Sequence, residues 1–309
     1  MHGLNATALR FSEADGNKRT GKTGQLAKPA QPISLENIMS YLEDLFSLEG
    51  QTAIVAGGAG VIGVSMSQAL LKAGANIAVW SRTQMSIDQA LDQLNRLGGA
   101  SDSTFGYQVD TGIEAEVREA LKATEAALST PEILINAVGG NLCKSPFIQS
   151  DLEQFEKVLK LNLTAGLMVP TKVVASYWIE KKIQGSIINL TSMTSYRPLS
   201  GVWGYNAAKA GVLNLTMAAA NEFAPYGIRV NAIAPGFFLG KQNRALLIDE
   251  KTGEYTDRGK AVIAHTPFKR FGDPQELAGA TLYLASAKAS GFVTGVSIPV
   301  DGGFLAFNI

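Results

Sequence analysis

The fold is decided by one stretch of sequence, Thr52-Ala53-Ile54-Val55-Ala56-Gly57-Gly58-Ala59-Gly60-Val61-Ile62-Gly63. Its first five residues form a short apolar run typical of a buried strand, and a cluster of glycines follows. Residues 64–73 then have the apolar spacing of a helix, which Gly74 ends. Glycines in such a turn let the backbone approach a pyrophosphate, and the helix N-terminus offers it free N–H groups. A glycine cluster alone is weak evidence, but a strand before it and a helix after it predict a dinucleotide site.

Strands and helices go on alternating along the rest of the chain. We expect strands at 76–80, 104–109, 132–135, 185–190, 228–233 and 296–300, and helices at 85–97, 113–128, 152–178, 210–223 and 274–284. We expect Pro170 to bend or divide the long helix at 152–178. The alternation predicts an α/β fold, a single Rossmann-type, doubly wound parallel sheet with helices on both faces. Ligands of such sheets bind at the carboxyl ends of the strands.

Composition excludes several classes of function. The formal net charge is zero, so nothing predicts a nucleic-acid surface. No apolar run reaches the roughly 20 residues that span a bilayer, so no membrane partner is expected. The single cysteine, Cys143, rules out an internal disulfide and is typical of a reducing, cytoplasmic compartment. Cys143, His2 and His265 are the only Cys and His residues, too few for a zinc-dependent alcohol dehydrogenase, so no metal is expected.

The N-terminal end of the chain and one insertion depart from this pattern. Residues 1–32 show no sustained period, and we expect a flexible N-terminal extension; a weak organelle-targeting signal is the alternative. Residues 33–309 are expected to form one catalytic domain, which opens with a short helix capped by Ser34. Within it, residues 237–271 form a long polar insertion, which we expect to act as a substrate lid.

Two Tyr-x-x-x-Lys pairs occur, and their contexts differ. Tyr205 and Lys209 lie four residues apart at the expected start of a helix, so both side chains share one face. A nearby ammonium favours the phenolate and lowers the phenol pKa, which would make Tyr205 a general acid/base. Ser192 ends a strand thirteen residues earlier and can face the same substrate. The other tyrosine, Tyr177, ends an apolar helix, and we expect it to pack in the core.

The second strand indicates which dinucleotide is bound. It ends in Trp80-Ser81-Arg82, where an NAD site usually carries a carboxylate for the ribose 2′-hydroxyl. No acid is present, and Arg82 can pair with a 2′-phosphate. A solvated surface arginine is the alternative. We therefore expect NADP to be preferred, with NAD possible.

With these motifs in order, the sequence from about Leu48 onward resembles the short-chain dehydrogenase/reductase family. Asn162, Ser192, Tyr205 and Lys209 match its catalytic tetrad. The resemblance implies hydride transfer between a nicotinamide and a carbonyl or secondary alcohol: Tyr205 moves the proton, Ser192 binds the oxygen, and Asn162 positions a water. The implied cofactor-binding residues are Gly57, Gly60, Val61, Ile62, Gly63, Ser81, Arg82, Asp110, Asn136, Ala137, Gly139, Tyr205, Lys209, Pro235, Gly236 and Phe238. Ala56, Val61, Ala137 and Gly240 depart from the usual family residues.

A narrower resemblance concerns the substrate. The stretches at 235–247, 265–272 and 300–304 resemble the mannonate oxidoreductase (fructuronate reductase) branch. This implies a keto sugar acid, bound by Ser192, Tyr205, Gln242, Asn243, Arg244 and His265, with Arg244 suited to the carboxylate. A neutral ketose or polyol, another ketone, and a non-catalytic cofactor-sensing role are the alternatives. The apolar helix at 207–223 resembles a subunit interface of family members, so a homotetramer is expected.

Overall fold

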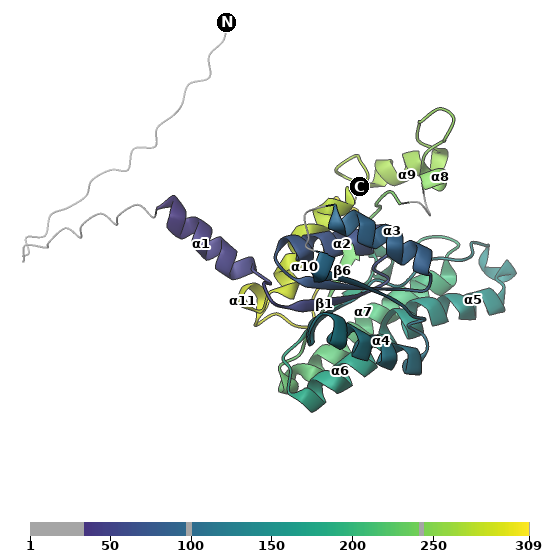
Figure 1. Ribbon diagram of the computed structural model, residues 1–309. Helices are drawn as coiled ribbons and strands as arrows, with labels where there is room; N and C mark the ends of the chain where they lie inside the picture. Colours follow the sequence, from purple (N-terminus) through teal and green to yellow (C-terminus); the bar gives the residue numbers. More distant parts are fainter. Residues whose placement is uncertain (1–33, 97–100, 241–243, 309) are drawn as a thin grey trace, which may run out of the picture.

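The computed structural model describes residues 34–96, 101–240 and 244–308 (Figure 1). The expected extension at 1–32 lies outside these residues. A single sheet of seven parallel strands runs through the centre, in the order β3-β2-β1-β4-β5-β6-β7. The strands are β1 (Thr52–Ala56), β2 (Asn76–Ser81), β3 (Thr104–Gln108), β4 (Pro131–Asn136), β5 (Ser186–Leu190), β6 (Arg229–Pro235) and β7 (Ser297–Val300). The expected α/β architecture is confirmed.

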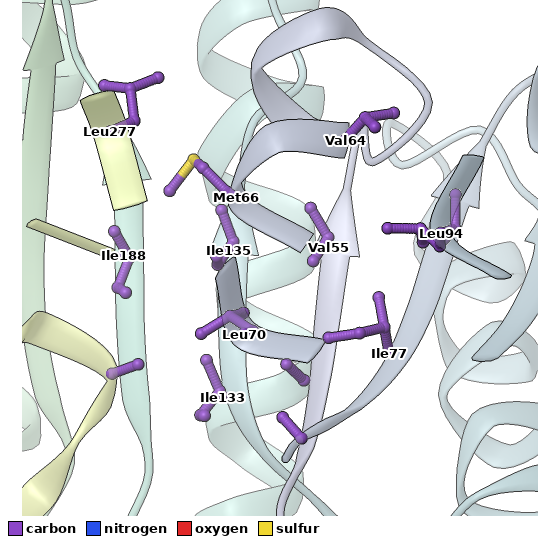
Figure 2. Close-up of a cluster of buried hydrophobic side chains, with 14 of the residues drawn as sticks. Val55, Val64, Met66, Leu70, Ile77, Leu94, Ile133, Ile135, Ile188 and Leu277 are labelled. Atoms are coloured by element: carbon purple, nitrogen blue, oxygen red, sulfur yellow. The ribbon is translucent and has the colours of Figure 1, made fainter. Parts of the chain in front are cut away.

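Helices cover both faces of the sheet (Figure 1). On one face pack α2 (Val61–Lys72), α3 (Gln84–Asn95) and α10 (Ala278–Ala285); on the other pack α4 (Glu114–Ala127), α6 (Val169–Lys181) and α7 (Trp203–Phe223). Figure 2 shows the core of the first face, where Val55 of β1 and Ile77 of β2 meet Met66 and Leu70 of α2. Alternate strand residues thus point to opposite helix layers, as the period of a strand requires.

The long helix at 152–178 is divided, but not where we expected. It consists of α5 (Leu152–Leu159), a π-helical segment (Lys160–Met168) and α6. Pro170 lies in the first turn of α6, where a proline removes no intrahelical hydrogen bond. The break therefore precedes Pro170 and contains Asn162. By length and composition Leu152–Lys181 could span a membrane, yet 56% of its most apolar window is buried inside the protein, as in a core helix.

The remaining elements lie at the two ends of the domain. Outside the sheet layers lie α1 (Leu35–Phe46), which Ser34 caps as expected, and α11 (Ala287–Ser290). The insertion after β6 contains α8 (Arg244–Leu247) and α9 (Asp257–His265), at the carboxyl ends of the strands. Short 3₁₀ turns span Ser101–Ser103, Phe147–Gln149, Met193–Ser195, Ala224–Tyr226 and Pro274–Leu277. Tyr255 pairs with Ile248 in an antiparallel bridge, which folds α9 back beside α8.

Candidate active site

A cavity of about 590 Å³ lies at the carboxyl ends of β4, β5 and β6. Three segments form its walls: the loops after these strands, the first turns of α7, and the insertion with α8 and α9. Of the sequence-predicted site residues, the cavity is lined by Ile62, Ala137, Gly139, Ser192, Tyr205, Lys209, Pro235, Gly236 and Phe238. Residues from five separate segments of the sequence therefore meet in one place.

Tyr205 and Ser192 meet in this cavity. Tyr205 is the third residue of α7, and the hydroxyl of Ser192, which follows β5, hydrogen-bonds to its phenol. The Ser192 Oγ also accepts the N–H of Thr194 at 3.2 Å, which fixes its direction. Burial raises the pKa of Tyr205, and the hydrogen bond with Ser192 offsets only part of the rise. The phenol is therefore protonated at neutral pH and can donate a proton to a bound carbonyl oxygen.

Lys209 lies one turn further along α7 and is buried. Its Nζ donates to the Leu190 carbonyl oxygen at 2.7 Å and lies 5.8 Å from the centroid of the Tyr205 ring. Burial lowers the pKa of Lys209 to about 8, so the ammonium persists at pH 7. We expected this cation to lower the pKa of Tyr205, but in the protein alone the net shift is upward. The reason is that burial outweighs the favourable interactions of the phenol.

The second pair, Tyr177 and Lys181, has a different environment. The Tyr177 hydroxyl donates to Glu125 Oε1 of α4 at 2.5 Å, and Tyr177 does not line the cavity. Burial, together with that carboxylate, raises the pKa of Tyr177 to about 12. A phenol held in this way is a structural donor, so the geometry separates the two Tyr-x-x-x-Lys pairs as their sequence contexts did.

Asn162 connects the π-helical segment to the loop after β4. Its Nδ2 donates to the Gly140 carbonyl oxygen at 2.7 Å, and its Oδ1 accepts the Gly140 N–H at 2.9 Å. A Cβ at Gly139 would lie 2.6 Å from Asn162 Oδ1 and 3.2 Å from Lys209 Nζ. The side chain of Asn162 therefore holds this wall of the cavity in position beside Lys209.

The glycine turn after β1 is shaped to receive a dinucleotide. Gly57 has a φ of +79°, and a Cβ at Gly63 would lie 2.4 Å from the Gly57 carbonyl oxygen, so α2 sits directly against the turn. Gly60 is the N-cap of α2 and places no side chain over its first N–H groups, while Val61 begins the helix. The chain thus offers a bare helix N-terminus to an anion, and the residues fit a nicotinamide dinucleotide.

Comparison with known proteins agrees with this geometry. A family model described as enoyl-(acyl carrier protein) reductase matches residues 57–305. The 2-dehydro-3-deoxy-D-gluconate 5-dehydrogenase of Formosa agariphila is 36% identical over 264 residues, which cover 85% of this chain and 96% of the relative. The chain belongs to the short-chain dehydrogenase/reductase family. It is accordingly an NAD(P)-dependent oxidoreductase that acts on CH–OH groups.

Two solved structures of similar proteins contain a cofactor. One, from Haemophilus influenza and provisionally named a D-mannonate oxidoreductase, has bound NAD; it is 35% identical, with a TM-score of 0.77, and the match covers 86% of this chain and 99% of that one. The other is a gluconate 5-dehydrogenase from Burkholderia cenocepacia J2315 in complex with NADP and tartrate. It is 30% identical, with a TM-score of 0.77, and the match covers 86% and 100% of the two chains.

Some predicted cofactor residues of this short-chain dehydrogenase do not line the cavity, among them Gly57, Gly60, Val61 and Gly63 of the glycine turn. Ser81 ends β2 and Arg82 follows it, beside the glycine turn, and Asp110 accepts the Gly112 N–H at 2.8 Å after β3. Asn136 is a different case, because its side chain turns toward the helix layer. There Nδ2 donates to Thr171 Oγ1 and Asn189 Oδ1, both at 2.9 Å. The side chain of Asn136 thus ties β4 to β5 and α6 and does not reach the cavity.

The substrate residues expected in the insertion are placed differently from the prediction. Gln242 and Asn243 lie outside the described residues. Arg244 begins α8 on the exposed surface and does not line the cavity. His265 does not line it either, because its Nδ1 bonds to the Ala261 carbonyl oxygen at 2.8 Å and its ring packs against Phe307. The structure therefore does not bring Arg244 or His265 to the cavity that holds Ser192 and Tyr205.

Two cations that sequence reasoning missed do line the cavity of this dehydrogenase, Lys144 and Arg258. Arg258 lies in the first turn of α9, whose N-cap is Thr256. The Thr-x-x-Gly spacing and the helical pattern from 257 to 265 were a signal for this helix, since threonine is a favoured N-cap. Nothing in the sequence alone indicated that α9 rather than α8 would face the cavity.

Proposed function

We propose that this enzyme transfers a hydride between NADP(H) and a keto sugar acid of the fructuronate/mannonate type. The observation that carries the proposal is the cavity itself, where the Ser192–Tyr205 pair and three cations share one space. The names of similar proteins support it, because a 2-dehydro-3-deoxy-D-gluconate 5-dehydrogenase and a gluconate 5-dehydrogenase both act on sugar acids.

The nicotinamide supplies or accepts the hydride when it is bound. Tyr205, which burial keeps in its protonated form, donates its phenolic proton to the carbonyl oxygen during reduction. Ser192 donates a hydrogen bond to the same oxygen and stabilises the negative charge that develops there. Lys209 keeps a positive charge beside the phenol and stabilises it after the proton has left. Asn162 bonds to the backbone of Gly140 and so fixes the loop beside Lys209. This loop keeps Lys209 and Tyr205 correctly positioned relative to the substrate and to a water that returns the proton.

We also propose that NADP is preferred to NAD. Arg82 follows directly after β2, is exposed, and forms no hydrogen bond or ion pair through its side chain with the described residues. The hydroxyl of the neighbouring Ser81 hydrogen-bonds to the Ser86 hydroxyl. Arg82 is the charged side chain directly after β2. A free guanidinium at that position suits a 2′-phosphate.

A substrate panel tests the proposed function. The purified protein is assayed with NADPH and NADH against keto sugar acids, neutral ketoses and lipophilic ketones. We expect keto sugar acids to be reduced fastest and simple ketones poorly, since hydroxyls and a carboxylate supply the binding energy that orients the carbonyl. Activity on lipophilic ketones with none on sugar acids would overturn the proposal. Cofactor binding with no turnover of any substrate would indicate a sensor.

A further inference from the structure

The side chains that line the cavity carry positive charge and no negative charge. Lys144, Lys209 and Arg258 line it, and no aspartate or glutamate does so among the described residues. Lys209 already has partners, because its ammonium bonds to the Leu190 carbonyl oxygen and lies beside Tyr205. Lys144 and Arg258 form no ion pair or side-chain hydrogen bond with any residue that the structure describes. Two free cations in a cavity without acids attract an anionic ligand.

The position of Arg258 is fixed by its own segment. Thr256 caps α9 by accepting the Gly259 N–H at 3.1 Å, and its hydroxyl donates to the Leu246 carbonyl oxygen at 2.8 Å. The Thr256 N–H donates to the Leu247 carbonyl oxygen at 3.0 Å. Since Leu246 and Leu247 are themselves part of the cavity wall, these bonds hold the backbone of Arg258 against that wall.

Lys144 reaches the cavity from a different segment, the loop after β4. The Ser145 N–H donates to the Gly201 carbonyl oxygen at 3.1 Å, and the side chain of Lys144 lies over Gly201, whose φ is +80°. The two free cations thus come from segments far apart in the sequence, and separate hydrogen bonds hold the two segments in place. A carboxylate has two oxygens and can accept hydrogen bonds from two cationic donors.

Burial shows which end of the cavity each group occupies. Ser192 and Lys209 are 6% and 4% exposed, whereas Lys144 and Arg258 are exposed. Tyr205 is half-buried and its phenol meets the buried Ser192, so the proton-transfer group lies toward the buried end and the free cations lie toward the open end. We propose that Arg258, assisted by Lys144, is the specificity-determining residue that binds the carboxylate of the substrate. The inference rests on the proposed function and deepens it.

This arrangement has a consequence for the position of the reacting carbon. With the carboxylate at Arg258 and the carbonyl at Tyr205, the two groups lie at opposite ends of the substrate. An acid whose ketone is remote from its carboxylate, such as a hexonate with its ketone at carbon 5, has a separate group for each end. A 2-keto acid would have to bring its carboxylate to the buried end, where losing water costs free energy and Lys209 is already occupied. We expect the enzyme to prefer 5-keto to 2-keto hexonates.

Paired arginine variants test the assignment. Arg258→Ala should lower kcat/KM about 10- to 100-fold for a 5-keto hexonate and less than about threefold for fructose, because only the acid loses a charge partner. Arg258→Lys should recover part of the loss, since it keeps the charge without the bidentate geometry. Arg244→Ala is the matched control, an arginine of the same insertion outside the cavity, and should behave as the unmodified enzyme. Equal losses on acid and ketose, or an effect of Arg244→Ala as large as that of Arg258→Ala, would overturn the assignment.

A binding measurement separates this inference from the proposed function. NADP-loaded enzyme is titrated with gluconate and with sorbitol, its uncharged counterpart, in the unmodified and Arg258→Ala forms. We expect gluconate to bind more tightly than sorbitol and Arg258→Ala to remove most of that difference, whether or not any keto acid turns over. If no keto sugar acid is reduced, the proposed function is wrong, but the binding comparison still tests whether Arg258 binds the carboxylate. An unchanged preference in the variant, or a better kcat/KM for a 2-keto than for a 5-keto hexonate, would overturn the inference.

Discussion

The two Tyr-x-x-x-Lys pairs provide an internal control for catalysis. Tyr205 hydrogen-bonds to Ser192 in the cavity, whereas Tyr177 bonds to Glu125 behind the sheet. Tyr205→Phe should lower turnover about 100- to 10,000-fold, the usual contribution of a general acid, while NADPH still binds. Tyr177→Phe should leave turnover almost intact and cost about 1 kcal/mol of stability through the lost hydrogen bond. Steady-state kinetics and cofactor fluorescence titration measure both, and reversed effects would contradict the active-site assignment.

Arg82 provides a second residue-scale prediction, on the cofactor. The unmodified enzyme should use NADPH better than NADH. Arg82→Ala should erase much of that preference by removing a phosphate ion pair of roughly 1.5–3 kcal/mol, and it should change kcat/KM for NADH little. Comparing kcat/KM for the two cofactors in both forms is the measurement. An unmodified enzyme that favours NADH would refute the prediction that Ser81-Arg82 selects NADP.

The residues that sequence reasoning found and those it missed differ in how they are positioned. Tyr205 and Ser192 were predictable because a strand end and a helix start place them at the same edge of a parallel sheet. Arg258 was not predictable because its place depends on how α9 folds back on α8. That geometry is set by bonds from Thr256 to Leu246 and Leu247, which no sequence period reveals.

The first helix after the glycine turn allows a prediction at the scale of an element. A Cβ at Gly63 would lie 2.4 Å from the Gly57 carbonyl oxygen, whereas one at Gly60 would lie 3.4 Å from the same atom. Gly63→Ala should push α2 away from the turn and cost about 1–3 kcal/mol of stability, as overpacking does. Gly60→Ala should fold normally and weaken cofactor binding, because its methyl group occupies the path of the pyrophosphate. Thermal unfolding and NADPH titration of both variants check this; equal melting temperatures would contradict the close packing.

Among the secondary-structure elements, the sequence predicted the strands but missed the π-helical segment Lys160–Met168. All seven strands lie close to their expected positions, and five of them (β1, β2, β4, β5 and β6) are short, largely buried runs. The π-helical segment was missed because its 9 residues are too few for the apolar pattern to distinguish the wider π turn from an α turn. Within the π-helical segment, Asn162 hydrogen-bonds to Gly140, which lies 22 residues away in the sequence. A local sequence pattern cannot predict such a long-range pairing. A break of this kind that contains Asn162, a predicted catalytic residue, agrees with the tendency of π turns to occur at functional sites.

On the scale of the whole molecule, several large apolar side chains are exposed at the start of α5 and on α7. Phe147, Ile148 and Leu152 lie at or before the start of α5 and are 71%, 92% and 73% exposed. Met217 is 47% exposed on α7, and α5 packs against α7, so these side chains belong to neighbouring elements. Exposed apolar surface of this extent is typical of an interface between subunits. The apolar character of α7 was already evident in the sequence, but the contribution of residues 147–152 emerged only from the fold.

We therefore expect a homotetramer that uses the surface of α5 and α7. Light scattering at micromolar concentration should give the mass of four chains, because burying these side chains against a second copy removes them from water. Met217→Lys should shift the population to smaller species, since a charge in an apolar interface loses its hydration. Met85→Lys is the matched control: Met85 is 73% exposed on α3, which covers the opposite face of the sheet, so this variant should remain tetrameric. A single-chain mass for the unmodified protein, or equal dissociation of the two variants, would contradict the assignment of this surface.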